Sequence, residues 1–236
     1  MKILFSNDDG YGAPGIEALT RAFSSFDYEV VAPDRERSGT SQTLTLVHPV
    51  RVIKKGERRF ACSGFPADCV MYSLLGVLEN RPDWVISGIN AGPNLGTDLI
   101  YSGTAAAARQ AALWGVPAMA VSLCGAHKAE EKEYDTAARW LRSRFEEIAA
   151  LWRPDTFINI NLPCGISEKD PFVRAVPARR FYSDKIEKFI AADKSEYYFL
   201  MGGAPKPPVD PNSDSYLVSQ GKIALSLIKI HPEAVD

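Results

Sequence analysis

Residues 1–19 read MKILFSNDDGYGAPGIEAL, and this opening stretch decides the fold class that we predict. The apolar run from Ile3 to Phe5 is typical of a buried β-strand, and residues 15–23 have the pattern of a helix start. Between them, residues 10–15 match the G-x-G-x-x-G loop of dinucleotide-binding proteins. Asp8 and Asp9 argue against a dinucleotide, because two carboxylates at the strand end repel a bare phosphate unless a divalent cation lies between them. The loop therefore holds either a dinucleotide or a metal.

The remainder of the first two-thirds of the chain continues this alternation of strands and helices. Further strands are predicted at residues 28–32, 83–87, 118–122 and 156–161, and helices at 15–24, 67–78, 103–114 and 134–151. A small hairpin is predicted from residues 50–53 and 59–61 around Gly56. Such alternation favours an α/β fold, a Rossmann-like, mostly parallel sheet with flanking helices.

The character of the sequence changes after about Pro163. Short β-like pieces at 196–202 and 222–230 are separated by a proline-rich segment that cannot continue a helix or a central strand. We therefore predict a single domain over residues 1–236, with a catalytic core over about 1–163 and a β-rich, hairpin-forming extension over about 164–236. The aromatic run at 197–199 either belongs to the core or packs on another subunit as an oligomerisation arm.

Composition excludes several classes of partner. A net charge of −2 over 236 residues gives no electrostatic reason to bind polymeric nucleic acid. The apolar start is interrupted by polar residues within the first ten positions, and the apolar region 104–124 contains Arg109 and Gln110, so neither a signal peptide nor a membrane span is predicted. The four cysteines form no C-x-x-C pair, which favours buried thiols over a zinc or redox site. We expect a cytoplasmic protein with small-molecule partners.

Polar residues follow several of the predicted strands. Asp8 and Asp9 follow the first strand, Ser38 lies in the loop after the second, and Asn90 follows the strand at 83–87. Because loops after parallel strands emerge at one edge of the sheet, these side chains are predicted to be neighbours. Taken singly, each has a simpler reading as turn chemistry or a helix cap. Together they are hard oxygen donors with almost no nitrogen or sulfur, which favours Mg²⁺ or Mn²⁺.

A second candidate feature is Ser102-Gly103-Thr104, directly before the alanine-rich stretch 105–108. The N-terminus of a helix presents free N–H groups and a partial positive charge, and these suit a phosphate. Ser102 also has a simple structural role as an N-cap, and the alanines allow close packing on the sheet. The two interpretations are compatible.

Five ordered blocks resemble the SurE family, the survival-protein metal-dependent phosphatases that act as 5′-nucleotidases. They are ILFSNDDGYGAPGIEAL (3–19), VVAPDRERSG (30–39), SGFPADCV (63–70), VISGINAGPNLGTDLIYSGTAAAA (85–108) and INLP (160–163). The resemblance implies a Rossmann-like fold, dimers or tetramers, and one divalent ion (Mg²⁺ or Mn²⁺) held by Asp8, Asp9, Ser38 and Asn90. The sequence departs from the family pattern at Gln42, where many relatives have histidine.

The resemblance implies hydrolysis of nucleoside 5′-monophosphates, with looser action on 3′-nucleotides or short polyphosphates. In this hypothesis Asp8 and Asp9 are catalytic through the metal, and the phosphate contacts are Asn94, Ser102, Gly103 and Thr104. Attack by water and attack by an aspartate both remain open. The alternatives are a non-catalytic nucleotide- or phosphate-sensing protein and a receiver-type domain. A receiver would need an aspartate and a lysine at strand ends where Ser87 and Ser122 stand.

Overall fold

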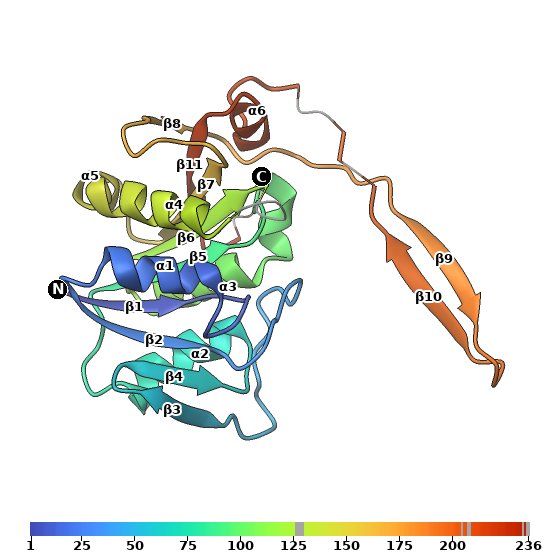
Figure 1. Ribbon diagram of the computed structural model, residues 1–236, viewed down its shortest axis with the longest axis horizontal. Coiled ribbons are helices and arrows are strands. Elements are labelled where there is room, and N and C mark those ends of the chain that lie inside the picture. The colour runs from blue at the N-terminus through green and yellow to red at the C-terminus, as the bar shows by residue number, and fades with distance from the viewer. Residues whose placement is uncertain (126–129, 204, 207–208, 233, 235–236) are drawn as a thin grey trace.

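The computed structural model describes residues 1–125, 130–203, 205–206, 209–232 and 234. Within these residues, nine strands form one sheet in the order β3-β4-β2-β1-β5-β6-β7-β11-β8 (Figure 1). Their bounds are β1 (Lys2–Ser6), β2 (Asp27–Pro33), β3 (Val52–Gly56), β4 (Arg59–Cys62), β5 (Trp84–Asn90), β6 (Ala118–Cys124), β7 (Thr156–Pro163), β8 (Phe172–Arg174) and β11 (Ile223–Lys229). The pairs from β4 through β7 are parallel, and β3 and β11 join antiparallel. The predicted mostly parallel α/β sheet and the small hairpin β3–β4 are confirmed.

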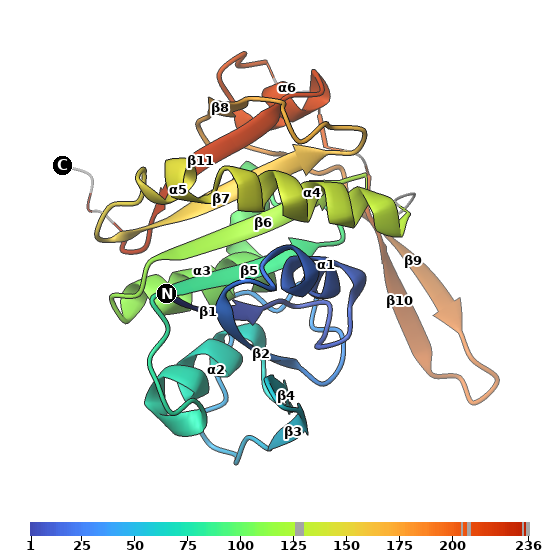
Figure 2. The same ribbon diagram turned by 60° about the vertical axis from the view of Figure 1, so that its left-hand side comes forward.

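Helices cover both faces of this sheet, as Figure 2 shows. One face carries α1 (Pro14–Ala22), α4 (Glu131–Ser143) and α5 (Phe145–Ala149), and the other carries α2 (Pro66–Tyr72), the short π-helix η1 (Ser73–Val77) and α3 (Gly103–Leu113). Each face has its own apolar core, so the central strands are buried on both sides. This explains why Ile3, Leu4 and Phe5 of β1 form an uninterrupted apolar run, since their side chains alternate between the two cores. Among the described residues, no helix is both long and apolar enough to cross a membrane.

The helix predicted over 134–151 is two helices. It begins earlier, at Glu131, and α4 ends at Ser143. Arg144 leaves the helical region with φ −110° and ψ 9°, and α5 follows it. The Ser143 hydroxyl donates to the Trp140 carbonyl, a local side-chain bond that competes with the helix ladder at this point. The apolar face still continues across the break, because Leu141, Phe145 and Ile148 belong to the same core.

The C-terminal segment divides into two parts that the sequence pattern did not separate. β8, β11 and α6 (Asp214–Ser219) belong with the main sheet, and β11 pairs with β7 from Ala224–Asn161 to Lys229–Thr156. Of the strands in the described residues, β9 (Lys185–Ile190) and β10 (Glu196–Met201) form a hairpin that stands away from the body (Figures 1 and 2). The structural arm therefore spans 185–201, which is narrower than the extension predicted from about 164.

Candidate active site

The polar loops meet where the strand order of the sheet reverses. β1 lies between β2 and β5 and runs parallel to both, with Ser6 beside Ser87. The chain leaves β1 through α1 toward β2, whereas it leaves β5 toward β6 on the other side. Diverging connections at such a point leave a crevice at the carboxyl ends of the strands, the usual ligand site of an open α/β sheet.

The glycines at 10–15 have structural roles at this crevice. Asn7 accepts from the Gly10 N–H and donates to the Gly10 carbonyl, which closes the turn after β1, and Gly10 has a φ of +109°. A Cβ at Gly15 would lie 1.9 Å from the carbonyl oxygen of Ile89, so only glycine lets α1 begin against β5. The G-x-G-x-x-G match is thus accounted for by the turn and by the packing of α1 on β5.

A cavity of about 720 Å³ opens at the same place. It is lined by all four residues that the sequence predicts as metal ligands and by two of the predicted phosphate contacts, namely Asp8, Asp9, Ser38, Asn90, Asn94 and Ser102. These come from the loops after β1 and β2, from the end of β5 and from the start of α3. The structure therefore brings together side chains that are almost a hundred positions apart in the sequence.

Asp8 is buried and held from one side. The Thr104 hydroxyl donates to Asp8 Oδ1 at 2.5 Å, and a Cβ at Gly103 would lie 2.8 Å from the Asp8 Cβ. Burial raises the pKa of Asp8 above its usual value, and the hydroxyl and backbone N–H of Thr104 oppose that rise. Gly103 and Thr104, predicted as phosphate contacts, thus lie behind Asp8. Neither lines the cavity.

Asp9 carries the second carboxylate of the pair. Its Oδ2 accepts from the Ala91 N–H at 3.2 Å. Burial first, and then the neighbouring charge of Asp8, raise the pKa of Asp9 to about 7, with a further contribution from Glu36. No Lys or Arg within the described residues forms an ion pair with Asp8, Asp9 or Glu36. A cluster of carboxylates without a positively charged partner favours the binding of a cation.

The remaining two predicted ligands present free acceptor oxygens. The Ser38 hydroxyl donates a hydrogen bond to Glu36 Oε1 at 2.9 Å, which leaves the lone pairs of the serine oxygen available. Asn90 donates through Nδ2 to the Gly92 carbonyl at 2.9 Å, which leaves its Oδ1 available. In the part of the chain that is described, no cluster of three or more His, Cys, Asp and Glu side chains suits a metal. A metal here would rely on a hydroxyl and an amide beside two carboxylates, an all-oxygen set that suits Mg²⁺ or Mn²⁺.

Asn94 and Ser102 are fixed by partners in the scaffold. Asn94 donates through its side chain to Ser122 and through its backbone to Asn161, and its carbonyl accepts from Asn159 and Asn161. Ser102 is the N-cap of α3 and accepts from the Ala105 N–H at 3.0 Å, as predicted. The amide pair at 159 and 161 was missed at the sequence level, although two buried asparagines two positions apart on one strand face signal a polar partner.

Comparison with known proteins shows which family the chain is related to over most of its length. A family model described as "Survival protein SurE" matches residues 3–184. The chain belongs to the SurE family. It is 40% identical over 230 residues to a "5'-nucleotidase SurE" of Gemmatimonas aurantiaca, covering 96% of this chain and 91% of the relative. It is 39% identical to one of Desulforudis audaxviator, covering 98% and 92%. The crystal structure of the Sure protein from Aquifex aeolicus has a TM-score of 0.83 at 30% identity, covering 99% and 95%.

Gln42, where the sequence is predicted to depart from the SurE pattern, contacts α3. Its Nε2 donates to Gln110 Oε1 at 2.9 Å, and its Oε1 accepts from Arg109 at 3.1 Å. It does not line the cavity. The glutamine therefore holds the loop after β2 against α3.

The base of the arm supplies a wall of the cavity through residues that the sequence analysis did not single out. Tyr182, Asp184 and Leu200 line the same cavity as Asp8 and Asp9. Arg180 forms an ion pair with Asp98, and the Tyr182 hydroxyl donates to the other oxygen of Asp98. No local pattern in the sequence indicates this contact, because it depends on where an irregular segment of chain returns to the sheet.

Proposed function

We propose that the chain is a divalent-metal-dependent phosphomonoesterase that hydrolyses nucleoside 5′-monophosphates to nucleoside and phosphate. The observation that carries the proposal is the convergence of Asp8, Asp9, Ser38 and Asn90 on one cavity beside the N-terminus of α3. Relatives that match nearly the whole chain bear the name 5'-nucleotidase, which supports the same activity. We include 3′-nucleotides and short polyphosphates as slower substrates.

One divalent ion, Mg²⁺ or Mn²⁺, would be held by Asp8, Asp9, Ser38 and Asn90. When bound, it would neutralise charge on the phosphate and lower the pKa of a bound water. Thr104 and Gly103 keep Asp8 in place for this ion: the threonine donates to the carboxylate, and the glycine leaves room for it. The Glu36 carboxylate accepts a hydrogen bond from the Ser38 hydroxyl, so the lone pairs of the serine oxygen are left for the ion.

The phosphate would bind beside the start of α3. Ser102 caps the helix, and the partial positive charge of a helix N-terminus attracts an anion. Asn94 contributes an amide whose orientation is set by Ser122 and Asn161. We assign Asp8 and Asp9 as the catalytic acidic groups, because they would hold the ion that contacts the phosphate. Water and an aspartate remain the two candidate nucleophiles.

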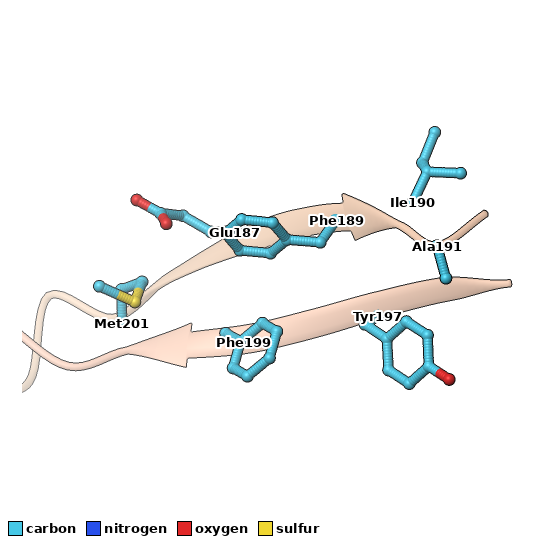
Figure 3. A pocket seen from close by; sticks show the side chains of 7 residues that line it. All are labelled: Glu187, Phe189, Ile190, Ala191, Tyr197, Phe199 and Met201. Atoms are coloured by element: carbon cyan, nitrogen blue, oxygen red, sulfur yellow. The ribbon is translucent and has the colours of Figure 1, made fainter. Parts of the chain in front are cut away.

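The hairpin β9–β10 supports a further proposal, that the chain forms a homodimer or homotetramer through this arm. Within the described residues, its two strands pair only with each other, and one face carries Phe189, Tyr197, Phe199 and Met201 around a groove of about 500 Å³ (Figure 3). These side chains are all about half exposed. An isolated two-stranded hairpin is marginal in water, and an apolar patch of this kind favours a protein partner.

We place the enzyme in the cytoplasm. All four cysteines are free, which fits a reducing compartment.

The test is phosphate release from the purified protein. AMP, a 3′-nucleotide, a short polyphosphate and a sugar phosphate are compared with Mn²⁺ added and with excess EDTA. We expect AMP to be hydrolysed fastest, and only with metal. Binding of AMP without any phosphate release would favour the nucleotide-sensing alternative. Full activity in EDTA would reject the metal site.

The matched variant for this test is Asp9→Asn, which keeps the size of the side chain and removes the charge. We expect its activity with Mn²⁺ to fall by at least about a hundredfold, because an anionic ligand is lost from the cation. Asp27→Asn, an exposed aspartate at the start of β2, serves as the control and is expected to retain activity.

A further inference from the structure

We propose that Tyr182, at the base of the β9–β10 arm, is the residue on which the nucleobase of the substrate stacks. The proposal rests on the function proposed above and adds the residue that distinguishes a nucleotide from other phosphate esters. It concerns the part of the cavity that the metal and phosphate sites do not use.

The cavity has two chemically different parts. Carboxylates, hydroxyls and amides line the part near Asp8 and Asp9, whereas Tyr101, Tyr182 and Leu200 also line the cavity and offer apolar surface. A nucleotide has the same division, with a charged phosphate and an aromatic base. An aromatic side chain gives a base about the same stacking energy whatever its hydrogen-bonding edge, so this contact tolerates different bases.

Tyr182 is held in a fixed orientation while part of its ring stays exposed. Its hydroxyl donates to Asp98 Oδ1, and the Arg180 guanidinium carbon lies 5.5 Å from the centre of the ring. Burial and the bond to Asp98 raise the pKa of Tyr182 to about 12, so the hydroxyl remains a donor at neutral pH. The residue is nevertheless 41% exposed. A ring fixed in this way loses little conformational freedom when a base stacks on it.

The residue that holds Tyr182 in place, Asp98, belongs to the segment that leads to the proposed phosphate site. Asp98 lies in the 3₁₀ helix η2 (Gly96–Ile100), four residues before Ser102. The segment before Tyr182 is attached to η2 by two bonds, since Thr97 donates to the Ala178 carbonyl at 3.1 Å and accepts from the Arg180 N–H at 2.9 Å. A Cβ at Gly96 would lie 1.8 Å from the Ala178 oxygen, so the two segments are in direct contact. The proposed base and phosphate contacts therefore share one rigid support.

Tyr101 is the competing aromatic residue of the cavity. It is 59% exposed, and its side chain has no hydrogen bond among those found within the described residues. It lacks the two contacts that orient Tyr182, which is why we assign stacking to Tyr182.

The experiment compares two substrates that share a 5′-phosphate on ribose and differ in the base, AMP and ribose 5-phosphate. For Tyr182→Ala we expect KM for AMP to rise about tenfold with kcat nearly unchanged, and kcat/KM for ribose 5-phosphate to change less than about twofold. Tyr182→Phe keeps the ring and is expected to retain most of the preference for AMP. Phe181→Ala is the matched control, because Phe181 is 66% exposed and lines a different cavity, with Ala178 and Lys206.

Three results would overturn the assignment. One is an unchanged ratio of AMP to ribose 5-phosphate activity in Tyr182→Ala. Another is a Tyr182→Phe variant that loses the preference as fully as Tyr182→Ala, which would indicate a hydroxyl contact instead of stacking. The third is loss of the preference in Tyr101→Ala alone. Failure of the proposed function is recognised separately, because the wild-type protein would then release no phosphate from AMP.

Discussion

At the scale of single residues, Thr104 decides how Asp8 is presented. Asp8 is buried, and a carboxylate in such a place needs a donor to keep its orientation. Thr104→Val retains the shape of the side chain and removes the hydroxyl that reaches Asp8 Oδ1. A hydrogen bond to a charged group contributes about 1.5–3 kcal/mol, so we expect kcat/KM for AMP to fall by roughly ten- to a hundredfold. Steady-state phosphate release measures this. Thr104→Ser keeps the hydroxyl and should recover most of the rate, whereas equal losses in both variants would assign Thr104 a packing role only.

Substitutions of Asn90 test how the net charge of the proposed metal site affects metal binding and catalysis. Asn90→Asp keeps the shape and an oxygen donor but adds a third carboxylate around the ion. We expect tighter Mn²⁺ binding by calorimetry, because a divalent ion gains an anionic ligand. We also expect kcat/KM to fall by roughly ten- to a hundredfold, because the positive field that stabilises the phosphate transition state weakens. Asn90→Ala should weaken both. Unchanged Mn²⁺ affinity in Asn90→Asp would remove Asn90 from the ligand set.

At the scale of elements, the strand ends explain which site residues could be predicted. Asp8, Asp9 and Asn90 end or follow strands that are recognisable from their apolar runs, and parallel topology alone places those ends together. Tyr182 could not be found in this way. Its position depends on the ion pair between Arg180 and Asp98, a contact between residues 82 positions apart. Side chains that reach a site through an irregular segment leave no periodic signal.

The hairpin β9–β10 carries the prediction at this scale. Replacing residues 185–201 with a short Gly-Ser linker removes two strands that pair only with each other, so the main sheet should fold unchanged. We expect the oligomeric mass measured by light scattering to decrease. Deleting everything after about Pro163 is a different experiment, because it also removes β11 with its core residues Ile223 and Leu225 and leaves the edge of β7 unpaired. That truncated chain should aggregate.

A point substitution tests whether assembly needs the apolar face of the hairpin and not only the hairpin itself. Phe189→Asp places a charge beside Phe199, whose ring lies 5.3 Å from that of Phe189. It should lower the oligomeric mass as the linker does. Leu46→Asp, at an apolar residue that is 80% exposed on the loop before β3, is the control and should leave the mass unchanged. An oligomer that survives both the linker and Phe189→Asp would contradict assembly through the arm.

At the scale of the whole molecule, the sequence predicts the buried central strands and their covering helices better than it predicts how the outer strands of the sheet pair. The five central strands are predicted because burial on both faces leaves apolar runs that few other structures require. Residues 222–230 also read as a strand, yet nothing in them specifies that β11 runs antiparallel to β7 and extends the main sheet. Edge pairing depends on which strand is left uncovered once the layers are packed. It is therefore a property of the assembled sheet.

The carboxylate pair in the loop that follows β1 gives the last prediction, which concerns stability. The pKa of Asp9 is raised in the folded protein to about 7 from 3.8, so its protonated form favours folding. That contribution is complete below about pH 4 and is lost as pH rises through about 7. Metal-free protein should therefore become less stable between pH 5 and pH 8. A divalent ion reverses the loss, and at a hundredfold excess over its Kd it should raise Tm at pH 8 by roughly 5–10 °C.

Thermal unfolding at pH 5 and pH 8, with EDTA or with Mn²⁺, measures both effects. The Mn²⁺ shift should be smaller at pH 5, because protons compete with the ion for Asp9. Asp9→Asn has no proton to lose, so its metal-free stability should change less between the two pH values, and its Mn²⁺ shift should be small at both. Asp27→Asn, at an exposed position on β2, should behave as the wild type. If Mn²⁺ raised Tm equally in the wild type and in Asp9→Asn, the ion would be binding away from the carboxylate pair, and the oxygen site at the end of β1 would be wrong.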